Sequence, residues 1–599
     1  MALKSPIRKF LSLPLGDLVR PKAAVLGWII FCLMAAASAL LSFFPLSTAA
    51  ALWTFFLGLL IPAGLFLLLP EPKEKNTVFF NRESLPSVPA WIWILVVALA
   101  VFLRLDRLTS LSSWPTVDEG VLGHFALGLS RQWNWELLEN NSQLPTLYSW
   151  GQALLFKVGG PGLFTLWLYP ALWSLACLPA AWILARKIFS KSMGFLVLFL
   201  AGTSFWPLYL GRLSVEGGFL FFGELICLLA LMDYCGRSGK KGEGFRLFVL
   251  NLITGLGFYT YLAWPLVAMA AAAALLFRTG IPAKKRFLHF LLFCLGTALL
   301  LLPLALAYRR EYLGYFNHVW AGDRLQNFFQ NLPLGVSYFR GLFWGLPGVP
   351  FYLGGFWGGL FNPLADALIF LGALAVLKRL SHPLGRFILA ASAIFFLPAL
   401  LTTNLEMMRL VTLCPVLLAL AGLGLHALLL NTPPSWRTAA ASVVLTGSLA
   451  LSWFHFLVVY PAYWQKNPGY YRDHKSAEYD RAYLLLKKKA RAEGPGLILL
   501  NFVPDPYDQT LKIAVDPFNA LENPKLNPEA SAWMGLLANV NTQPYLSSRF
   551  PEGKWFWLSQ GLNRPDGGLL LALIPLSPAN RTDLEGWSRA DQSLEPLVD

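Results

Sequence analysis

Apolar segments of about 20 residues recur through most of this 599-residue chain, and they restrict its fold more than any other feature. A helix of that length crosses roughly 30 Å of hydrocarbon. Backbone N–H and C=O groups in lipid must pair within their own segment, so each apolar segment is expected to be a helix. The composition agrees, because 56% of the residues are hydrophobic, only 14% are charged and the mean hydropathy is +0.53. These values are far from those of a soluble domain.

The sequence therefore predicts a polytopic α-helical membrane protein with about 13 transmembrane helices. The two short spans around Pro265 have the weakest pattern. The expected spans are roughly 24–45, 49–70, 89–104, 162–185, 193–210, 213–234, 247–263, 264–278, 287–307, 362–379, 386–403, 410–429 and 438–460.

Basic residues fall in every second loop, which is the positive-inside arrangement of a multi-pass protein of the plasma (inner) membrane. This pattern places the N-terminus in the cytoplasm. The net charge of +15 then follows from topology and anionic headgroups, so nucleic acid is not an expected partner. The basic groups are Lys4, Arg8, Lys9, Arg20 and Lys22; Lys73, Lys75 and Arg82; Arg186, Lys187 and Lys191; Arg237, Lys240, Lys241 and Arg246; Arg278, Lys284, Lys285 and Arg286; Lys378, Arg379 and Arg386; and Arg437.

The same alternation divides the chain into three parts. Residues 1–88 form an N-terminal cytoplasmic segment with an extra transmembrane hairpin, and residues 89–460 form the main membrane module. Two long loops of that module, 105–160 and 308–360, are expected on the extracytoplasmic side, together with everything in 461–599.

The tail at 461–599 is richer in charge and proline than the rest and predicts a small extracytoplasmic α/β domain. Residues 475–491 have a helical pattern. Short apolar runs bounded by Gly, Pro and Asp predict strands at 497–503, 511–515 and 569–574.

Cysteine and histidine usage gives no sign of a disulfide framework or a zinc site. All six cysteines lie in or beside spans, and the seven histidines lack metal-ligand spacing. Neither a metal nor a cofactor is predicted. The cysteines are Cys32, Cys177, Cys227, Cys235, Cys294 and Cys414.

An acidic pair, Asp118 and Glu119, lies just past a span in the first long outer loop. A carboxylate at the membrane surface can take the proton of a hydroxyl that attacks a lipid-borne donor. A solvated loop with incidental acids explains the pair alone equally well. The loop, however, has two apolar patterns of helical spacing that predict helices lying in the interface, which would hold the acids just above the lipid. These are Val121, Leu122, Phe125 and Leu129, and Leu147, Trp150 and Leu154.

Further polar residues are expected at the same membrane edge. Arg212 and Glu216 in GRLSVEGGF stand at i and i+4, where one helix face would let them pair. Tyr259 and Tyr261 end a span in LGFYTYLAWP, where an aromatic belt is the commoner explanation. Arg409 in NLEMMRLVTLCP is a lone outer arginine and a candidate ligand for lipid phosphate.

The second outer loop adds His318 and Arg324 as candidate substrate-binding residues, although solvated or snorkelling positions are commoner for such side chains. Each of these signals is weak alone. Together they lie on one membrane face, which favours an enzyme whose donor is anchored in the bilayer and whose acceptor arrives from outside.

Several motifs between about 90 and 430 resemble those of the GT-C glycosyltransferases, in particular the bacterial relatives of protein O-mannosyltransferases and of the lipid A aminoarabinose transferase. The motifs are TVDEGVLGHFA, QLPTLYSWGQALLFKVGG, GRLSVEGG, GLGFYTYLAWP and MMRLVTLCP. Many relatives carry His-Pro-Pro or Lys-Pro-Pro where this chain has Leu144-Pro145-Thr146. The resemblance does not extend to the first 75 residues or to the tail beyond 460.

This resemblance implies a hexosyl- or pentosyltransferase that uses a polyprenyl-phosphate sugar donor and an extracytoplasmic hydroxyl acceptor. By the same resemblance Asp118 is the base and Glu119 orients the site. Arg409, and less securely Arg212, match positions that face the polyprenyl phosphate. Such transferases commonly work without a divalent metal, although the oligosaccharyltransferase branch uses one.

Two other functions remain open from the sequence. A transporter or lipid flippase would have charged or broken helices near the bilayer midplane, and Glu224 and Asp366 are the acids nearest span interiors. An O-antigen ligase or polymerase would use a lipid-diphosphate donor and arginine-rich outer loops. The sugar, the acceptor and the oligomeric state are not encoded in any motif.

Overall fold

The computed structural model describes most of residues 90–454 and short pieces of the tail. Gaps lie at 110–116, 136, 139–144, 190, 237–241, 279–280, 312–331, 344–359, 381 and 402–406. Beyond 454 the described residues are 457, parts of 482–493, and 497–499, 533–539, 547–548, 551–557 and 569–575. The expected spans 24–45 and 49–70 and the expected strand 511–515 lie outside these residues.

The chain separates into two compact units, each described here by itself. The helical unit is Met1–Asp106, Ala171–Gly211 and Glu216–Tyr460. The loop-and-sheet unit is Arg107–Pro170, Arg212–Val215 and Pro461–Asp599. The first outer loop, the turn in GRLSVEGG and the tail therefore share a unit, whereas the sequence suggested only that they share a membrane face.

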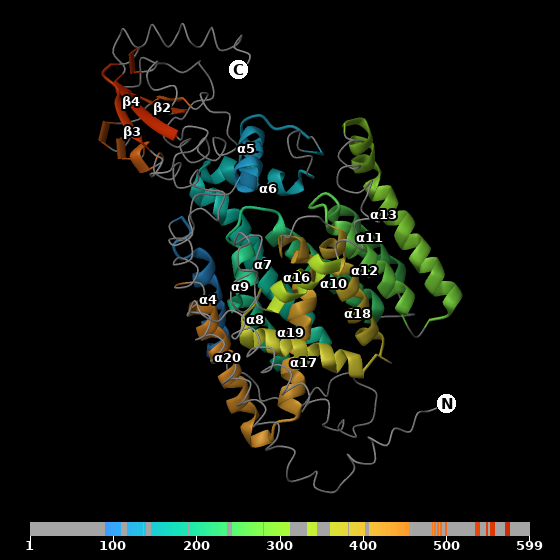
Figure 1. Ribbon diagram of the computed structural model, residues 1–599. Helices are drawn as coiled ribbons and strands as arrows, with labels where there is room; N and C mark the ends of the chain where they lie inside the picture. Colours follow the sequence, from blue (N-terminus) through green and yellow to red (C-terminus); the bar gives the residue numbers. More distant parts are fainter. Residues whose placement is uncertain are drawn as a thin grey trace. The chain divides into compact units, whose positions relative to one another are not determined.

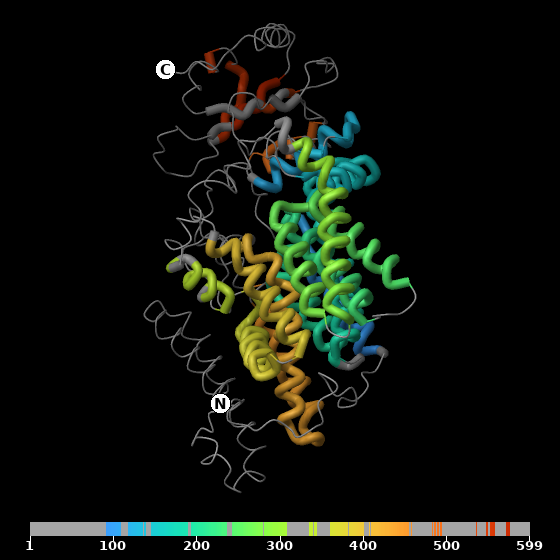
Figure 2. Tube along the Cα trace, turned by 90° about the vertical axis from the view of Figure 1, so that its right-hand side faces the viewer, coloured from blue at the N-terminus to red at the C-terminus, as the bar shows by residue number. Residues whose placement is uncertain are grey.

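The helical unit is a bundle of α-helices (Figures 1 and 2). Eleven of the expected spans coincide with helices in the described residues, although the full count of about 13 stays a prediction. Its helices are α4 (Ala90–Leu105), α7 (Leu163–Ile188), α8 (Lys191–Thr203), α9 (Phe205–Leu210), α10 (Gly217–Gly236), α11 (Glu243–Gly257), α12 (Trp264–Phe277), α13 (Ala283–Glu311), α16 (Leu332–Phe343), α17 (Pro363–Lys378), α18 (Pro383–Leu401), α19 (Cys414–Leu430) and α20 (Arg437–Phe454), with 3₁₀ helices η1 (Met407–Leu413) and η2 (Pro434–Trp436).

Five segments among the described residues are long and apolar enough to cross a bilayer. They are Leu163–Ile188, Gly217–Gly236, Ala283–Ala307, Pro383–Leu400 and Arg409–Leu430. The apolar helices α4, α8 and α12 are shorter. These lengths agree with a membrane-embedded protein.

The expected span 193–210 is interrupted in the structure. Ser204 has extended backbone angles (φ −67°, ψ 149°), so α8 ends before it and α9 begins after it. A new helix start exposes N–H groups that need acceptors. The N–H groups of Phe205 and Trp206 donate to the carbonyls of Phe361 and Leu360, at 3.4 and 2.9 Å. The break is therefore stabilised by a segment more than 150 residues further along the chain.

Buried polar side chains connect helices in this unit. Arg104, fully buried near the end of α4, donates to Ser174 Oγ (2.8 Å) and to the carbonyls of Gly202 (2.8 Å) and Ala201 (3.1 Å). Asn362 caps α17 by accepting from the Ala365 N–H, and its amide donates to Ser448 and Ser452 of α20. A buried polar group needs such partners, because an unmade hydrogen bond there is costly.

The loop-and-sheet unit contains α5 (Val117–Arg131), α6 (Leu147–Gly159) and a four-stranded sheet, with the first turns of α7. Helices α5 and α6 confirm the two helices that the spacing of apolar residues predicted for the first outer loop. Trp133, Trp135 and Trp150 pack together there, with ring centroids 5.3 to 6.4 Å apart.

The tail forms a mixed sheet with the order β1-β2-β4-β3, from β1 (Leu497–Leu499), β2 (Trp533–Asn539), β3 (Lys554–Trp557) and β4 (Leu569–Pro575). Strand β1 is parallel to β2, and β4 is antiparallel to β2 and β3. The expected strands at 497–503 and 569–574 are present in part and in full, while β2 and β3 were not expected. Described residues in 482–493 are helical, as predicted.

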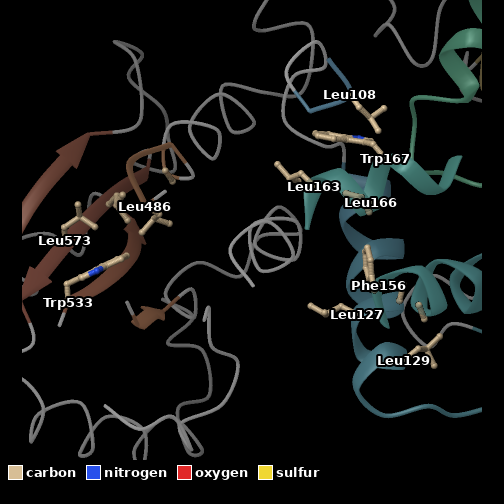
Figure 3. Close-up of a cluster of buried hydrophobic side chains, with 14 residues drawn as sticks. Leu108, Leu127, Leu129, Phe156, Leu163, Leu166, Trp167, Leu486, Trp533 and Leu573 are labelled. Carbon is tan, nitrogen blue, oxygen red and sulfur yellow. The ribbon is translucent and has the colours of Figure 1, made fainter. Parts of the chain in front are cut away.

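Buried apolar side chains of this unit come from both its helices and its sheet (Figure 3). Phe156, Leu166 and Trp167 belong to the helical group, and Trp533 and Leu573 to the sheet group.

Helices α17 and α19 cross so closely that only glycine fits at two positions. A Cβ on Gly372 would collide with the backbone of Leu420, and a Cβ on Gly424 would collide with the backbone of Leu368. Small residues at such crossings are the usual means of bringing membrane helices together.

Gly372→Ala and Gly424→Ala are each expected to destabilise the protein by about 1–3 kcal/mol, because the added methyl group overpacks a contact between backbones. Thermal unfolding in detergent measures the effect. Gly244→Ala on α11 is the matched control, since nothing lies within 4 Å of an added Cβ there. Equal unfolding temperatures for all three variants would contradict this description of the crossing.

Candidate active site

The acidic pair lies in the first turn of α5, where the two carboxylates have different surroundings. Asp118 is exposed, whereas Glu119 is only 2% exposed. Consecutive residues on a helix point about 100° apart, so one can reach solvent while the other is buried. Acids in the first turn are also favoured by the helix dipole.

Glu119 connects three segments of the loop-and-sheet unit. Its Oε1 accepts a hydrogen bond from the indole N–H of Trp167 at 2.9 Å and from the backbone N–H of Ser214 at 2.7 Å. Trp167 is in the first turns of α7, and Ser214 is in the turn of GRLSVEGG. Two buried hydrogen bonds on one side chain therefore fix the start of α5 against both segments.

A second layer of buried polar groups surrounds Ser214. Gln152 Nε2 on α6 donates to Ser214 Oγ at 2.7 Å and to the carbonyl of Leu166 at 3.3 Å. The hydroxyl of Tyr148 lies 3.4 Å from Ser214 Oγ, and its ring packs edge-on against Tyr169, with centroids 4.9 Å apart. The first outer loop and the turn of GRLSVEGG are therefore joined by side chains from α5, α6 and α7.

Arg212 belongs to this assembly. The single helix face expected for Arg212 and Glu216 is absent, because residues 211–216 form turns and bends before α10 begins, and the pairing of the two side chains stays a prediction. The Arg212 guanidinium donates to the carbonyl of Arg107 at 3.0 Å. Arg212 and Glu216 are both buried, and the Glu216 carbonyl accepts from the Leu220 N–H at the start of α10.

The two tyrosines of LGFYTYLAWP lie in the turn between α11 and α12. The Tyr259 hydroxyl donates to the carbonyl of Leu300 on α13 at 2.9 Å, which is a packing role. Tyr261 is partly buried, and its carbonyl accepts the N–H of Trp264 at 3.1 Å. The indole of Trp264 donates in turn to the carbonyl of Thr254 at 2.6 Å and closes the turn.

Arg409 is partly buried in η1, the 3₁₀ segment that leads into α19. It therefore precedes the regular helix, as its position before the expected span 410–429 suggested. His318 and Arg324 lie outside the described residues.

Four residues of the acidic-pair assembly were missed by sequence reasoning: Tyr148, Gln152, Trp167 and Ser214. Tyr148 and Gln152 lie in the motif QLPTLYSWGQALLFKVGG, and Ser214 lies in GRLSVEGG. Their polar side chains within these motifs could have marked them as candidate site residues. Trp167 lies within an apolar span and carries no such signal.

Among the residues that the structure describes, no group of three or more His, Cys, Asp or Glu side chains is placed to hold a metal ion. In the described part of the loop-and-sheet unit, the solvent-facing carboxylate of Asp118 lies beside the buried, hydrogen-bonded side chain of Glu119.

Glu119→Ala is expected to destabilise the protein by about 2–4 kcal/mol, because it leaves the buried donors of Trp167 and Ser214 without this acceptor. Trp167→Phe removes only one of the two bonds and is expected to cost about 1 kcal/mol. Thermal unfolding of purified protein tests both changes. Glu552→Ala, in an exposed turn of the same unit, is the control and is expected to stay within about 0.5 kcal/mol of the parent. A Glu119 variant as stable as this control would refute the anchoring role.

The chain was compared with protein-family models, curated proteins and solved structures, and only the solved structures gave matches. No protein-family model and no curated protein matches the sequence. Among solved structures, ArnT from Cupriavidus metallidurans bound to undecaprenyl phosphate matches with a TM-score of 0.52 and 13% identity, over 82% of this chain and 99% of that one. ArnT in the apo state matches with a TM-score of 0.50 and 14% identity, over 81% and 97% of the two chains. The oligosaccharyltransferase AglB from Archaeoglobus fulgidus gives a TM-score of 0.47 at 12% identity.

The matches cover 97% and 99% of the two ArnT chains. The chain has the fold of the GT-C membrane glycosyltransferases.

Proposed function

We propose that this chain is a membrane glycosyltransferase that moves a sugar from a polyprenyl-phosphate donor to a hydroxyl-bearing acceptor on the extracytoplasmic face. The observation that supports this most is the arrangement of α5, in which Asp118 is exposed at the first turn while Glu119 beside it is anchored from two sides. It occurs in a chain with the fold of a protein whose structure contains undecaprenyl phosphate.

The proposed reaction is a single displacement that inverts the sugar. Asp118 takes the proton of the acceptor hydroxyl while that oxygen bonds to the anomeric carbon. The bond from that carbon to the phosphate oxygen breaks, and the polyprenyl phosphate leaves with its electron pair. The acceptor keeps the sugar, and the proton remains on Asp118 until solvent removes it.

Glu119 has a different part in this proposal, as a positioning residue. Its Oε1 is occupied by Trp167 and Ser214, and its side chain is buried, so it does not exchange protons with an acceptor. It fixes the first turn of α5 and so limits the positions that Asp118 can adopt. Precise placement of a reacting group is a large part of enzymatic rate acceleration.

Arg409 is proposed to neutralise the donor phosphate, since a guanidinium can form two parallel hydrogen bonds with phosphate oxygens. Arg212 is a weaker candidate, because its guanidinium already donates to the Arg107 carbonyl. Glu216, Tyr259, Tyr261, His318 and Arg324 remain proposed substrate-binding residues. Of these, Tyr259 has the weakest support, because its hydroxyl is engaged by Leu300.

Asp118→Asn is expected to lower sugar transfer about 10²–10⁴-fold, because the amide cannot accept the hydroxyl proton. The assay reconstitutes the protein with undecaprenyl-phosphate hexoses and pentoses and a membrane extract as acceptor source, and follows labelled sugar out of the donor. Glu552→Gln removes another exposed carboxylate of the same unit and is expected to retain full turnover. Full turnover by the Asp118 variant would eliminate it as the base.

A transporter or flippase remains the second candidate, because two acids are fully buried in the helical unit. Glu224 in α10 and Asp366 in the first turn of α17 are at most 1% exposed, and no hydrogen-bond partner is found for their carboxylate oxygens among the described residues. Ionisable groups at membrane depth often line transport pathways.

Donor chemistry separates the candidates. The proposed enzyme is expected to consume a monophosphate-linked sugar and leave a diphosphate-linked one intact, because the departing group is a single phosphate. The same vesicles, offered each donor separately, report product by chromatography and donor orientation by accessibility to an external oxidant. Transfer from the diphosphate donor alone would favour a ligase or polymerase, and donor reorientation without product would favour a flippase.

A further inference from the structure

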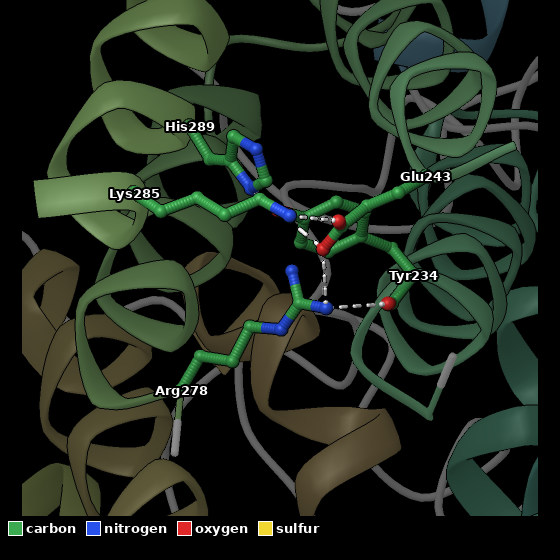
Figure 4. Close-up of polar contacts among 5 residues, drawn as sticks. All are labelled: Tyr234, Glu243, Arg278, Lys285 and His289. Carbon is green, nitrogen blue, oxygen red and sulfur yellow. Dashed lines mark hydrogen bonds and ion pairs between the residues drawn. The ribbon is translucent and has the colours of Figure 1, made fainter. Parts of the chain in front are cut away.

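One end of the helical unit holds a cluster of charged side chains that the proposed reaction does not use. Figure 4 shows Tyr234, Glu243, Arg278, Lys285 and His289 pointing toward one another. They come from the end of α10, the start of α11, the residue that follows α12, and the start of α13.

Glu243 is at the centre of this cluster. Its two carboxylate oxygens are held by different cations, Oε1 by Arg278 Nη2 at 2.8 Å and Oε2 by Lys285 Nζ at 2.7 Å. The Arg278 guanidinium lies over the ring of Tyr234, with its central carbon 4.1 Å from the ring centroid. The Tyr234 hydroxyl is hydrogen-bonded to His289 Nδ1.

Burial would raise the pKa of Glu243, but hydrogen bonds from Lys285 and the charge of Arg278 outweigh that effect and hold the pKa below its ordinary value. Glu243 is therefore a carboxylate at neutral pH and carries one negative charge.

Among the described residues at the start of α13 and just before it, cations predominate. Arg278, Lys284, Lys285 and Arg286 are close in sequence; Arg278 and Lys285 pair with Glu243, and Arg286 Nη1 donates to the Arg278 carbonyl at 3.1 Å. We name these four residues the basic cluster. The nearby carboxylate of Asp233 does not offset them, because it is bonded to Arg246 at 3.1 Å and lies 3.9 Å from Lys187.

The outer members of the basic cluster are accessible. The Lys285 side chain is 43% exposed and Lys284 is exposed, whereas the Arg278 side chain is only 3% exposed. Arg278 still has two buried N–H groups, at Nε and Nη1, for which the described residues provide no acceptor. An anion approaching Lys284 and Lys285 would thus meet a further buried positive charge behind them.

Exposed apolar side chains extend from this cluster along α11 and α13, the two helices that pack side by side (Figure 2). On α13 they recur every three or four residues, which makes a continuous stripe along one helix face. The exposed residues are Phe245, Phe248, Leu252 and Leu256 on α11, and Phe287, Leu288, Leu291, Leu292, Leu295, Leu299, Leu302 and Leu306 on α13.

We propose that an anionic phospholipid binds at this end of α11 and α13. Its headgroup phosphate contacts Lys284, Lys285 and Arg286, with Arg278 as the buried charge behind them, and its acyl chains lie along the apolar stripe. A soluble phosphate compound would satisfy the charge but leave the stripe uncovered, whereas a phospholipid matches both. Basic groups at the end of membrane helices are known to favour anionic lipid in this way.

Native mass spectrometry of the detergent-purified protein, titrated with phosphatidylglycerol or phosphatidylcholine of equal chain length, tests the proposal. The wild-type chain is expected to bind phosphatidylglycerol at least tenfold more tightly than phosphatidylcholine. Inorganic phosphate at millimolar concentration is expected not to displace the lipid. Equal affinity for both lipids, or displacement by phosphate, would overturn the proposal, the latter because it identifies a free-ion site.

The variant Lys284→Gln/Lys285→Gln assigns the binding to the cluster. Each basic residue near anionic lipid contributes a factor of about five, so phosphatidylglycerol affinity is expected to fall about 25-fold when two are removed. Lys157→Gln/Lys488→Gln removes the same charge from exposed positions in the loop-and-sheet unit and is expected to bind as wild type. Equal affinities of the two double variants would disprove the site. The lipid comparison in the wild-type chain stands even if the cluster variant folds poorly.

Discussion

The candidate site depends on the hydrogen bonds that the buried side chain of Glu119 accepts. A buried polar group is stable only when it is hydrogen-bonded, and the Glu119 side chain has two donors, from Trp167 and from the backbone of Ser214. These two bonds require that α5, the start of α7 and the turn of GRLSVEGG meet at one point. The exposure of Asp118 follows, because anchoring one residue of a helical turn fixes the direction of its neighbour.

The membrane helices were largely predictable, because the requirement that backbone groups pair within lipid leaves little choice of structure. The expected span 162–185 corresponds to α7 and the expected span 362–379 to α17, each within a few residues. The break at Ser204 was not predictable from its own apolar run, because the carbonyls that compensate for it come from Leu360 and Phe361. Strand β2, with the sequence WMGLLAN, lacks the β-branched residues that mark strands, so its pairing with β4 reflects tertiary context.

Sequence reasoning identified the acidic pair and the motif turn, but not how they are connected. The bonds of Glu119 join residues 48 and 95 positions apart, and no local pattern encodes such separations. The contact of the Arg212 guanidinium with the carbonyl of Arg107 spans 105 positions and was likewise not encoded by any local pattern. For Tyr259 the sequence offered a substrate contact or an aromatic belt, and neither predicted the bond of its hydroxyl to the carbonyl of Leu300 on α13.

The crossing of α17 and α19 has a mechanical consequence. At Gly372 and Gly424 the backbones of the two helices are in direct contact, with no side chain between them. Close-packed interiors transmit displacement, so the two helices are expected to move together. A change of shape in the helical unit would then be accommodated at its irregular segments, such as the interruption at Ser204 or the 3₁₀ turn that carries Arg409.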